Sequence, residues 1–178
     1  ANFDVVTGKA ISFKGDNSLA RYRFVAHTVP KFKLPATAAK GGWDDRDIPA
    51  LALMCEKVHA HGALAAVELT HNGPAASNLF SREVLLAPSH QPSKYGYPAQ
   101  ARAMDKADIR DLRRWHREAA LRSRDAGFDI VYVYAGHHMT IAQHFLLPHM
   151  NQRSDEYGGS LENRVRLTRE LLEDAREA

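Results

Sequence analysis

The sequence has little cysteine, no long apolar run and no large excess of either charge. Its single cysteine, Cys55, excludes an internal disulfide and leaves no cysteine-rich metal cluster within these residues. No apolar run approaches the roughly 20 residues that a membrane-spanning helix needs, so we expect no membrane partner. The first residues lack the basic-then-apolar pattern of a secretory signal. These absences together favour a cytoplasmic protein.

Charge is nearly balanced, with 24 Lys and Arg against 21 Asp and Glu. The basic residues between 108 and 118 alternate with acidic ones, as is typical of a solvated helix face. We therefore expect no nucleic-acid partner. The chain has 178 residues and is 44% hydrophobic, which is enough for one domain with a sizeable core.

Residues 43–178 carry an alternating pattern of helices and strands. Helical spacing and stop signals predict helices over about 45–61, 105–126 and from 160 to the end. Short apolar runs predict strands over 63–69 and 128–134. This alternation indicates an α/β fold with a parallel sheet and right-handed crossovers.

Three helix starts have recognisable capping residues. Asp44 and Asp45 are expected to cap the first helix, and Cys55 falls on its buried face. Asp105 is expected to cap the second helix, with Asp108 completing a capping box. Ser160 precedes the third helix.

Other segments show no helical period. Residues 70–104 are rich in Asn, Gly, Pro and Ser, and we expect a long functional loop there. Residues 1–42 differ from the remainder of the chain and are expected to form two or three short strands and a loop. We therefore divide the chain into 1–42 and 43–178.

The strand at 128–134 ends on a tyrosine that is followed three residues later by a histidine, Tyr134 and His137. Alternation along the strand puts Tyr134 on one face with Tyr132 and Ile130. A phenol and an imidazole at a strand end can orient an amine or move a proton. From spacing alone, a core tyrosine and a loop histidine are the slightly favoured interpretation, and the catalytic pair is the alternative.

Several separate motifs carry a family resemblance. They are AGFDIVYVYAGH at 126–137, QHFLLP at 143–148 and NQRSDEYGGSLENR at 151–164. The chain resembles the old yellow enzyme superfamily of FMN-dependent (β/α)8 oxidoreductases. Within it, the chain is similar to the trimethylamine dehydrogenase branch, which includes dimethylglycine and N-methylproline demethylases. The resemblance implies a partial TIM barrel, roughly its N-terminal half.

The resemblance also implies site residues. Tyr134 and His137 match the substrate-side catalytic pair, which distinguishes the amine-oxidising branch from ene reductases. Glu68 matches a strand-end position that contacts the flavin pyrimidine. His27 and Thr28 match the first barrel strand, which packs against the flavin. Covalent-flavin relatives have cysteine in place of Thr28, so the resemblance implies non-covalent FMN.

The loop at 151–164 is interpreted as mainly architectural. Arg153 and Arg164 within it are expected to pair with acidic residues nearby.

The implied activity is oxidation of a secondary or tertiary N-methyl amine. The implied partners are a small-molecule amine and an electron-transfer protein. Complete relatives of this branch hold a 4Fe–4S centre on a cysteine cluster, which these residues lack. A half barrel would expose sheet edges, so we expect a homo-oligomer. An ene reductase, and a catalytically incomplete half barrel that acts through assembly, stay as alternatives.

A histidine cluster at His137, His138, His144 and His149 raises a metal-site alternative. Its spacing lacks the usual helical pair four residues apart, and no carboxylate ligand accompanies it. We therefore expect no metal.

Overall fold

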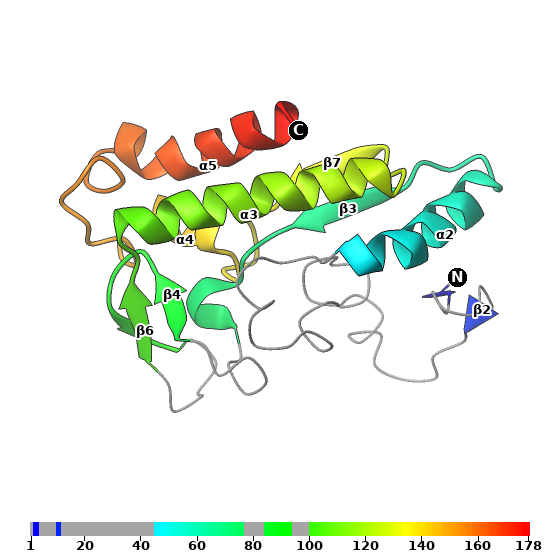
Figure 1. The fold of residues 1–178 in the computed structure, drawn as a ribbon. Coiled ribbons are helices and arrows are strands. Elements are labelled where there is room, and N and C mark those ends of the chain that lie inside the picture. Colours follow the sequence, from blue (N-terminus) through cyan, green and yellow to red (C-terminus); the bar gives the residue numbers. More distant parts are fainter. Residues whose placement is uncertain (1, 4–9, 12–44, 77–83, 94–99) are drawn as a thin grey trace.

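The computed structural model describes residues 2–3, 10–11, 45–76, 84–93 and 100–178 (Figure 1). Near the amino terminus, β1 (Asn2–Phe3) pairs antiparallel with β2 (Ala10–Ile11). The other strands expected before residue 43, together with His27 and Thr28, lie outside the described residues.

Two parallel strands form the centre of the fold. β3 (Ala66–Leu69) pairs with β7 (Ile130–Val133), with Ala66 opposite Ile130 and Leu69 opposite Val133. The long helix α3 (Lys106–Asp125) precedes β7 in the chain and packs against β3 (Figure 1). The predicted parallel pairing of these two strands through a helical crossover is confirmed.

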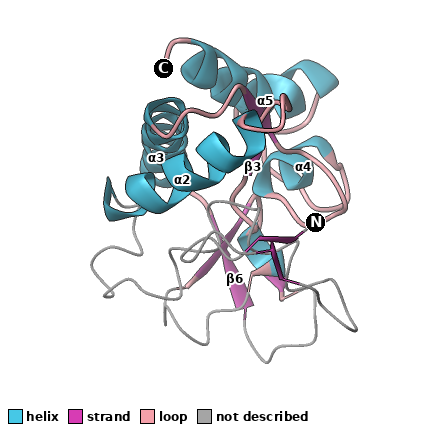
Figure 2. Ribbon diagram, turned by 90° about the vertical axis from the view of Figure 1, so that its right-hand side faces the viewer, coloured by secondary structure: helices cyan, strands magenta, loops and turns pink. Residues whose placement is uncertain are grey.

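Three helices cover one face of this strand pair. They are α2 (Ile48–His59), α3 and α5 (Leu161–Arg176); Figure 2 shows α2 and α3 beside β3, with α5 above them. Val67 and Leu69 on β3 are only 1% and 2% exposed and pack against the helices. The opposite face is open among the described residues, with Tyr132 51% exposed. Alternate residues of the two strands are therefore buried and exposed, as the sequence pattern predicts.

The residues that bury the covered face come from all three helices and both strands. Besides Val67 and Leu69, the cluster contains Leu51, Ala119, Ala120, Phe128, Val131 and Ala175.

The starts of α3 and α5 match the sequence expectation. The Asp105 carboxylate accepts from the Asp108 N–H at 2.8 Å, and the Asp108 carboxylate accepts from the Asp105 N–H at 2.8 Å. This capping box leaves fewer unpaired amides in the first turn. Ser160 Oγ accepts from the Asn163 N–H at 3.3 Å.

The start of α2 differs from the expectation. A short 3-10 turn, η2 (Asp45–Asp47), precedes the helix, and the residue before its first turn is Asp47, which makes no side-chain cap. Asp45 instead accepts from Arg122 Nε at 2.5 Å, so its predicted capping role is wrong. Pro49 occupies the first turn and has no N–H to cap, which reduces the need for a capping side chain. Asp44 lies outside the described residues.

The segment predicted as one long loop contains regular structure. The turn η3 (Gly73–Ala75) is followed by β4 (Leu85–Ala87), β5 (Gln91–Pro92) and β6 (Gln100–Ala103). β6 lies between a parallel β4 and an antiparallel β5. These strands are too short to show a period, and only their pairing identifies them.

A short helix was also missed. α4 (Ile141–Leu146) begins at the cap Thr140, and its Ile141, Ala142 and Phe145 are buried. They join a core with Leu167 and Leu171 of α5. Among the described residues, no helix combines the length and apolarity needed to cross a bilayer.

Candidate functional site

The candidate site lies where β3 and β7 end. Glu68 pairs with Tyr132 across the strands, and the Tyr134 N–H donates to the Leu69 carbonyl at 3.0 Å. The ladder thus continues one step beyond both strands. Because side chains alternate, Glu68, Thr70 and Tyr134 face away from the helices. Parallel α/β units place functional groups at this carboxyl edge.

Tyr134 and His137 are in direct contact. The Tyr134 hydroxyl and His137 Nδ1 are hydrogen-bonded, and the ring centroids are 5.8 Å apart. Gly136 lies between them in the chain, and a Cβ there would approach the Tyr134 hydroxyl to 3.1 Å. A glycine therefore leaves room for the tyrosine ring to fold back toward the histidine. The geometry brings the predicted pair together, and its catalytic role stays a prediction.

The chain after Tyr134 has an unusual backbone. His137 and His138 have φ angles of 57° and 53°, positive values that residues other than glycine rarely adopt. His138 donates its N–H to Gln143 Oε1 at 2.5 Å, and its carbonyl oxygen lies 2.9 Å from His144 Nε2. These contacts connect the loop to α4.

The loops after β3 and β7 are also packed against each other. The Ile141 N–H donates to the His71 carbonyl at 2.7 Å. Gly73 has a φ of +54°, and a Cβ there would lie 3.0 Å from Ile141 Cδ1 and 3.3 Å from His144 Nδ1. Only glycine permits both this backbone angle and this close approach.

Two side chains on the open face could hold the pyrimidine edge of a flavin. Glu68 is half-buried, and its carboxylate is an acceptor for a ring N–H. The Thr70 hydroxyl oxygen is buried and has no hydrogen-bond partner in the described part of the chain. A buried hydroxyl without a partner is costly, so a ligand that pairs with it would be favoured. The residues present therefore fit the expected cofactor.

The histidine cluster is not arranged as a metal site. His144 Nε2 lies within hydrogen-bond distance of a carbonyl, and His149 is exposed. Within the described ranges, no three His, Cys, Asp or Glu side chains are grouped to hold a metal ion.

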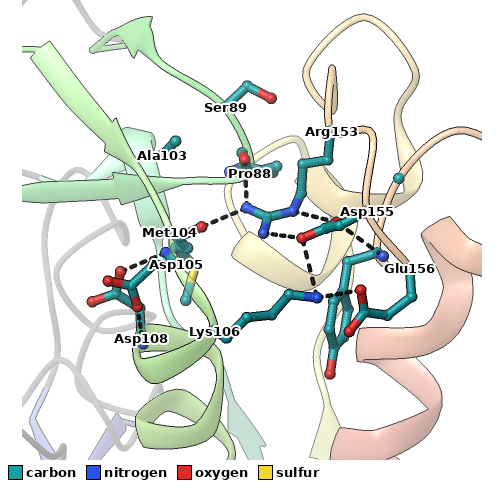
Figure 3. Close-up of polar contacts among 12 residues, drawn as sticks. Pro88, Ser89, Ala103, Met104, Asp105, Lys106, Asp108, Arg153, Asp155 and Glu156 are labelled. Carbon is teal, nitrogen blue, oxygen red and sulfur yellow. Dashed lines mark hydrogen bonds and ion pairs between the residues drawn. The ribbon is translucent and has the colours of Figure 1, made fainter.

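Arg153 anchors the loop that follows α4 (Figure 3). Its guanidinium binds Asp155 at 2.5 and 2.9 Å, and donates to the Pro88 and Met104 carbonyls. Lys106 pairs with Asp155 at 3.2 Å and also with Glu156. The Arg153 side chain holds the pKa of Asp155 well below its usual range. The predicted acidic partner of Arg153 is confirmed.

Two other residues of this loop support its architectural interpretation. Arg164 donates to the carbonyls of Leu146 and Gly159. Within the described part of the chain it forms no ion pair, so the acidic partner predicted for Arg164 is not found there. A Cβ on Gly158 would lie 2.2 Å from the Arg153 carbonyl oxygen, so no larger residue fits without movement.

Sequence reasoning gave Thr70 and Gln143 no role at the site, and it considered His144 only as a possible metal ligand. Thr70 follows Glu68 by two residues, and strand alternation could have assigned it to the same face. No sequence signal identifies Gln143 and His144, because their contacts depend on how α4 packs.

Solved and curated proteins resemble the chain over most of its length. Dimethylamine dehydrogenase of Hyphomicrobium sp. (strain x) is 41% identical over 143 residues, covering 76% of this chain and 19% of its own. An NADPH dehydrogenase of Halalkalibacterium halodurans is 39% identical, covering 75% of this chain and 38% of its own. The chain thus spans about a fifth to two fifths of these relatives.

The structure of histamine dehydrogenase from Rhizobium sp. 4-9 is 51% identical with a TM-score of 0.74, covering 76% of this chain and 21% of that one. This likeness shows that the matched 76% of the chain forms part of an α/β barrel. The sequence profile of the NADH:flavin oxidoreductase / NADH oxidase family matches residues 35–178. With that match and the βαβ arrangement of β3, α3 and β7, the chain belongs to this family of flavin-dependent oxidoreductases.

Proposed function

We propose that the protein oxidises a secondary or tertiary N-methyl amine with non-covalent FMN. The observation that carries this proposal is the hydrogen-bonded pair Tyr134 and His137, on the same sheet face as Glu68. Two of the similar proteins are named as dehydrogenases of amines, dimethylamine and histamine. An electron-transfer protein as the final acceptor, and a cytoplasmic location, belong to the same proposal.

The two residues have complementary tasks in this proposal. A protonated amine lacks the lone pair that stabilises positive charge on the neighbouring carbon, so it must lose its proton before oxidation. His137 removes that proton, and Tyr134 orients the nitrogen through its hydroxyl. When bound, the flavin supplies the acceptor for the hydride from the carbon next to nitrogen.

Glu68 and Thr70 hold the cofactor in this proposal. Glu68 accepts a hydrogen bond from the pyrimidine N–H, and Thr70 pairs its hydroxyl with a neighbouring polar atom of the ring. From the resemblance, His27 and Thr28 are also proposed to contact the flavin. The absence of cysteine at position 28 supports a non-covalent cofactor.

The test is anaerobic flavin reduction. The full chain loaded with FMN is mixed with dimethylamine, dimethylglycine or N-methylproline, and absorbance at the flavin bands is followed. We expect bleaching that slows by about 100-fold or more in Tyr134→Phe and His137→Ala. His61→Ala, an exposed histidine beyond the opposite strand ends, is the matched control. Equal bleaching in all variants would contradict the assigned roles.

A second candidate is reduction of an activated alkene by NADPH. It is favoured by the NADPH dehydrogenase relative, which is nearly as similar as the amine dehydrogenase. Turnover of an enone with NADPH, with no bleaching by any amine, would replace the first proposal with this one.

The open face of the strand pair supports a further part of the proposal. Ile130 and Tyr132 on this face are 37% and 51% exposed. We propose that this face is covered in the working protein, by additional chain or by a second copy in a homo-oligomer. Size-exclusion chromatography with light scattering measures the second case. A catalytically incomplete half barrel that acts through assembly would show the oligomer and no flavin binding.

A further inference from the structure

We infer that Gln143 and His144 are positioning residues that hold His137 against Tyr134. They do so by binding the two peptide groups on either side of His138. This inference rests on the proposed function, in which Tyr134 and His137 contact the substrate.

The first argument is the backbone strain at this point. Two consecutive histidines have φ angles of 57° and 53°, where an L side chain crowds its own carbonyl. A non-glycine residue stays in this region only where surrounding contacts over-determine it. Something must therefore hold these two residues in place.

The second argument is the contact set around His138. Its N–H, in the peptide that joins it to His137, donates to Gln143 Oε1 at 2.5 Å. Its carbonyl, in the next peptide, lies 2.9 Å from His144 Nε2. A carbonyl can only accept, so Nε2 of His144 carries the proton and donates. The peptide groups before and after His138 are thus each bound by one of two adjacent residues of α4.

The third argument is that this helix cannot easily move. His144 is 0% exposed, as is its neighbour Phe145 in the core between α3 and α5. Gly73, after β3, packs so closely on His144 that an added Cβ would lie 3.3 Å from its Nδ1. The Thr140 hydroxyl caps the start of the helix. The position of the His138 peptides is therefore tied to the core.

The expected consequence is kinetic. Without the two contacts, His137 can relax to an ordinary backbone angle and leave the Tyr134 hydroxyl. Proton removal from the substrate then slows, while binding of the amine changes little. Loss of a positioning contact should lower kcat by about tenfold or more and leave KM within about twofold.

Paired substitutions of the full chain test this. Gln143→Met and His144→Phe remove the acceptor and the donor while keeping size. Gln143→Glu and His144→Gln keep an acceptor and a donor and should recover most of the rate. Glycine adopts positive φ without strain, so Gln143→Met should cost several-fold less in a His138→Gly background. An equal cost in both backgrounds would overturn the inference.

A readout that does not depend on activity separates the inference from the proposed function. The ¹³Cα chemical shifts of His137 and His138 report their backbone angles and should move toward ordinary values in Gln143→Met. Gln152→Met, which makes the same side-chain change and removes a hydrogen bond to the Pro148 carbonyl but no contact to His138, is the control. If His144→Phe fails to fold, the Gln143 variants still test the inference. Unchanged shifts in folded Gln143→Met would overturn the inference, whereas full activity of Tyr134→Phe would overturn only the proposed function.

Discussion

Glu68 on β3 lies directly opposite Tyr132 on β7, and both side chains lie on the face opposite the described helices α2, α3 and α5. This register fixes which groups share the open face. It also places Thr70 opposite Tyr134, because the ladder continues through the hydrogen bond from the Tyr134 N–H to Leu69. The four positions form a two-by-two arrangement at the carboxyl ends of the strands.

Glu68 is predicted to control FMN affinity. Glu68→Ala should weaken FMN binding by about tenfold or more, because hydrogen bonds to a charged group contribute roughly 1.5–3 kcal/mol. Glu68→Gln keeps an acceptor and should lose less. Quenching of FMN fluorescence on titration measures both. Glu56→Gln, an exposed residue of α2, is the control, and an equal effect there would argue against a contact at Glu68.

Thr70→Val is predicted to affect the cofactor-free and FMN-bound proteins in opposite ways. Removing a buried hydroxyl that lacks a partner among the described residues should stabilise the cofactor-free protein by about 1 kcal/mol. The same change should weaken FMN binding several-fold. Urea unfolding and FMN titration give the two measurements.

The matched control for this prediction is Thr168→Val. Thr168 lies on α5, and its hydroxyl is also buried without a partner in the described part of the chain. It should reproduce the stabilisation without any change in FMN affinity. Weaker FMN binding in both variants would show that Thr70 acts through stability alone.

His116 is predicted to make the protein acid-sensitive. His116 is buried on α3, and neither ring nitrogen has a hydrogen-bond partner among the described residues. Burial lowers the pKa of His116 from 6.5 to about 4, although the nearby charge of Asp174 on α5 acts to raise it. Above about pH 6.5, His116 does not lower the free energy of unfolding. As pH falls, this histidine is protonated in the unfolded chain but stays neutral in the folded chain, so the free energy of unfolding decreases until about pH 4.

The loss at His116 should reach at most about 3 kcal/mol. Urea unfolding at a series of pH values measures it. His116→Leu should flatten the dependence between pH 6.5 and 4. The exposed His61→Leu should leave it unchanged. A dependence that persists in His116→Leu would assign the acid sensitivity to other groups.

Arg153 is predicted to be a major stabilising residue. Its side chain is 10% exposed and binds one carboxylate and two carbonyls from separate segments. Arg153→Met should cost about 2–4 kcal/mol because the Pro88 and Met104 carbonyls lose their guanidinium donor, while Asp155 keeps its ion pair with Lys106. Arg153→Lys should recover only part, since an ammonium cannot reproduce the planar set of contacts. Thermal and urea unfolding measure both.

The exposed Arg169 provides the comparison for this prediction. It pairs with Glu173 one turn away at 3.7 Å, and both side chains are more than half exposed. Arg169→Met should cost no more than about 0.5 kcal/mol. Similar costs at the two arginines would contradict the anchoring role of Arg153.

Local sequence determined the elements whose signals lie within a few residues. The capping box of Asp105 and Asp108, the burial of Cys55 on α2 and the alternation along β7 follow from short-range geometry and apolar spacing. The sequence motifs also identified the family and brought Tyr134 and His137 into consideration. The cap at Asp45 was wrong because a long-range partner, Arg122, binds that carboxylate.

Tertiary structure decided what depends on distant segments. The strands at 85–87 and 100–103 exist because they pair with each other, and nothing in their few residues requires it. The contacts of Gln143 and His144 with His138 need α4 packed into the core beside Gly73. The sequence thus determined the helices, the strand faces and the identity of the candidate pair. The fold decided the partners, because a hydrogen bond between residues far apart in the chain depends on packing that no local pattern encodes.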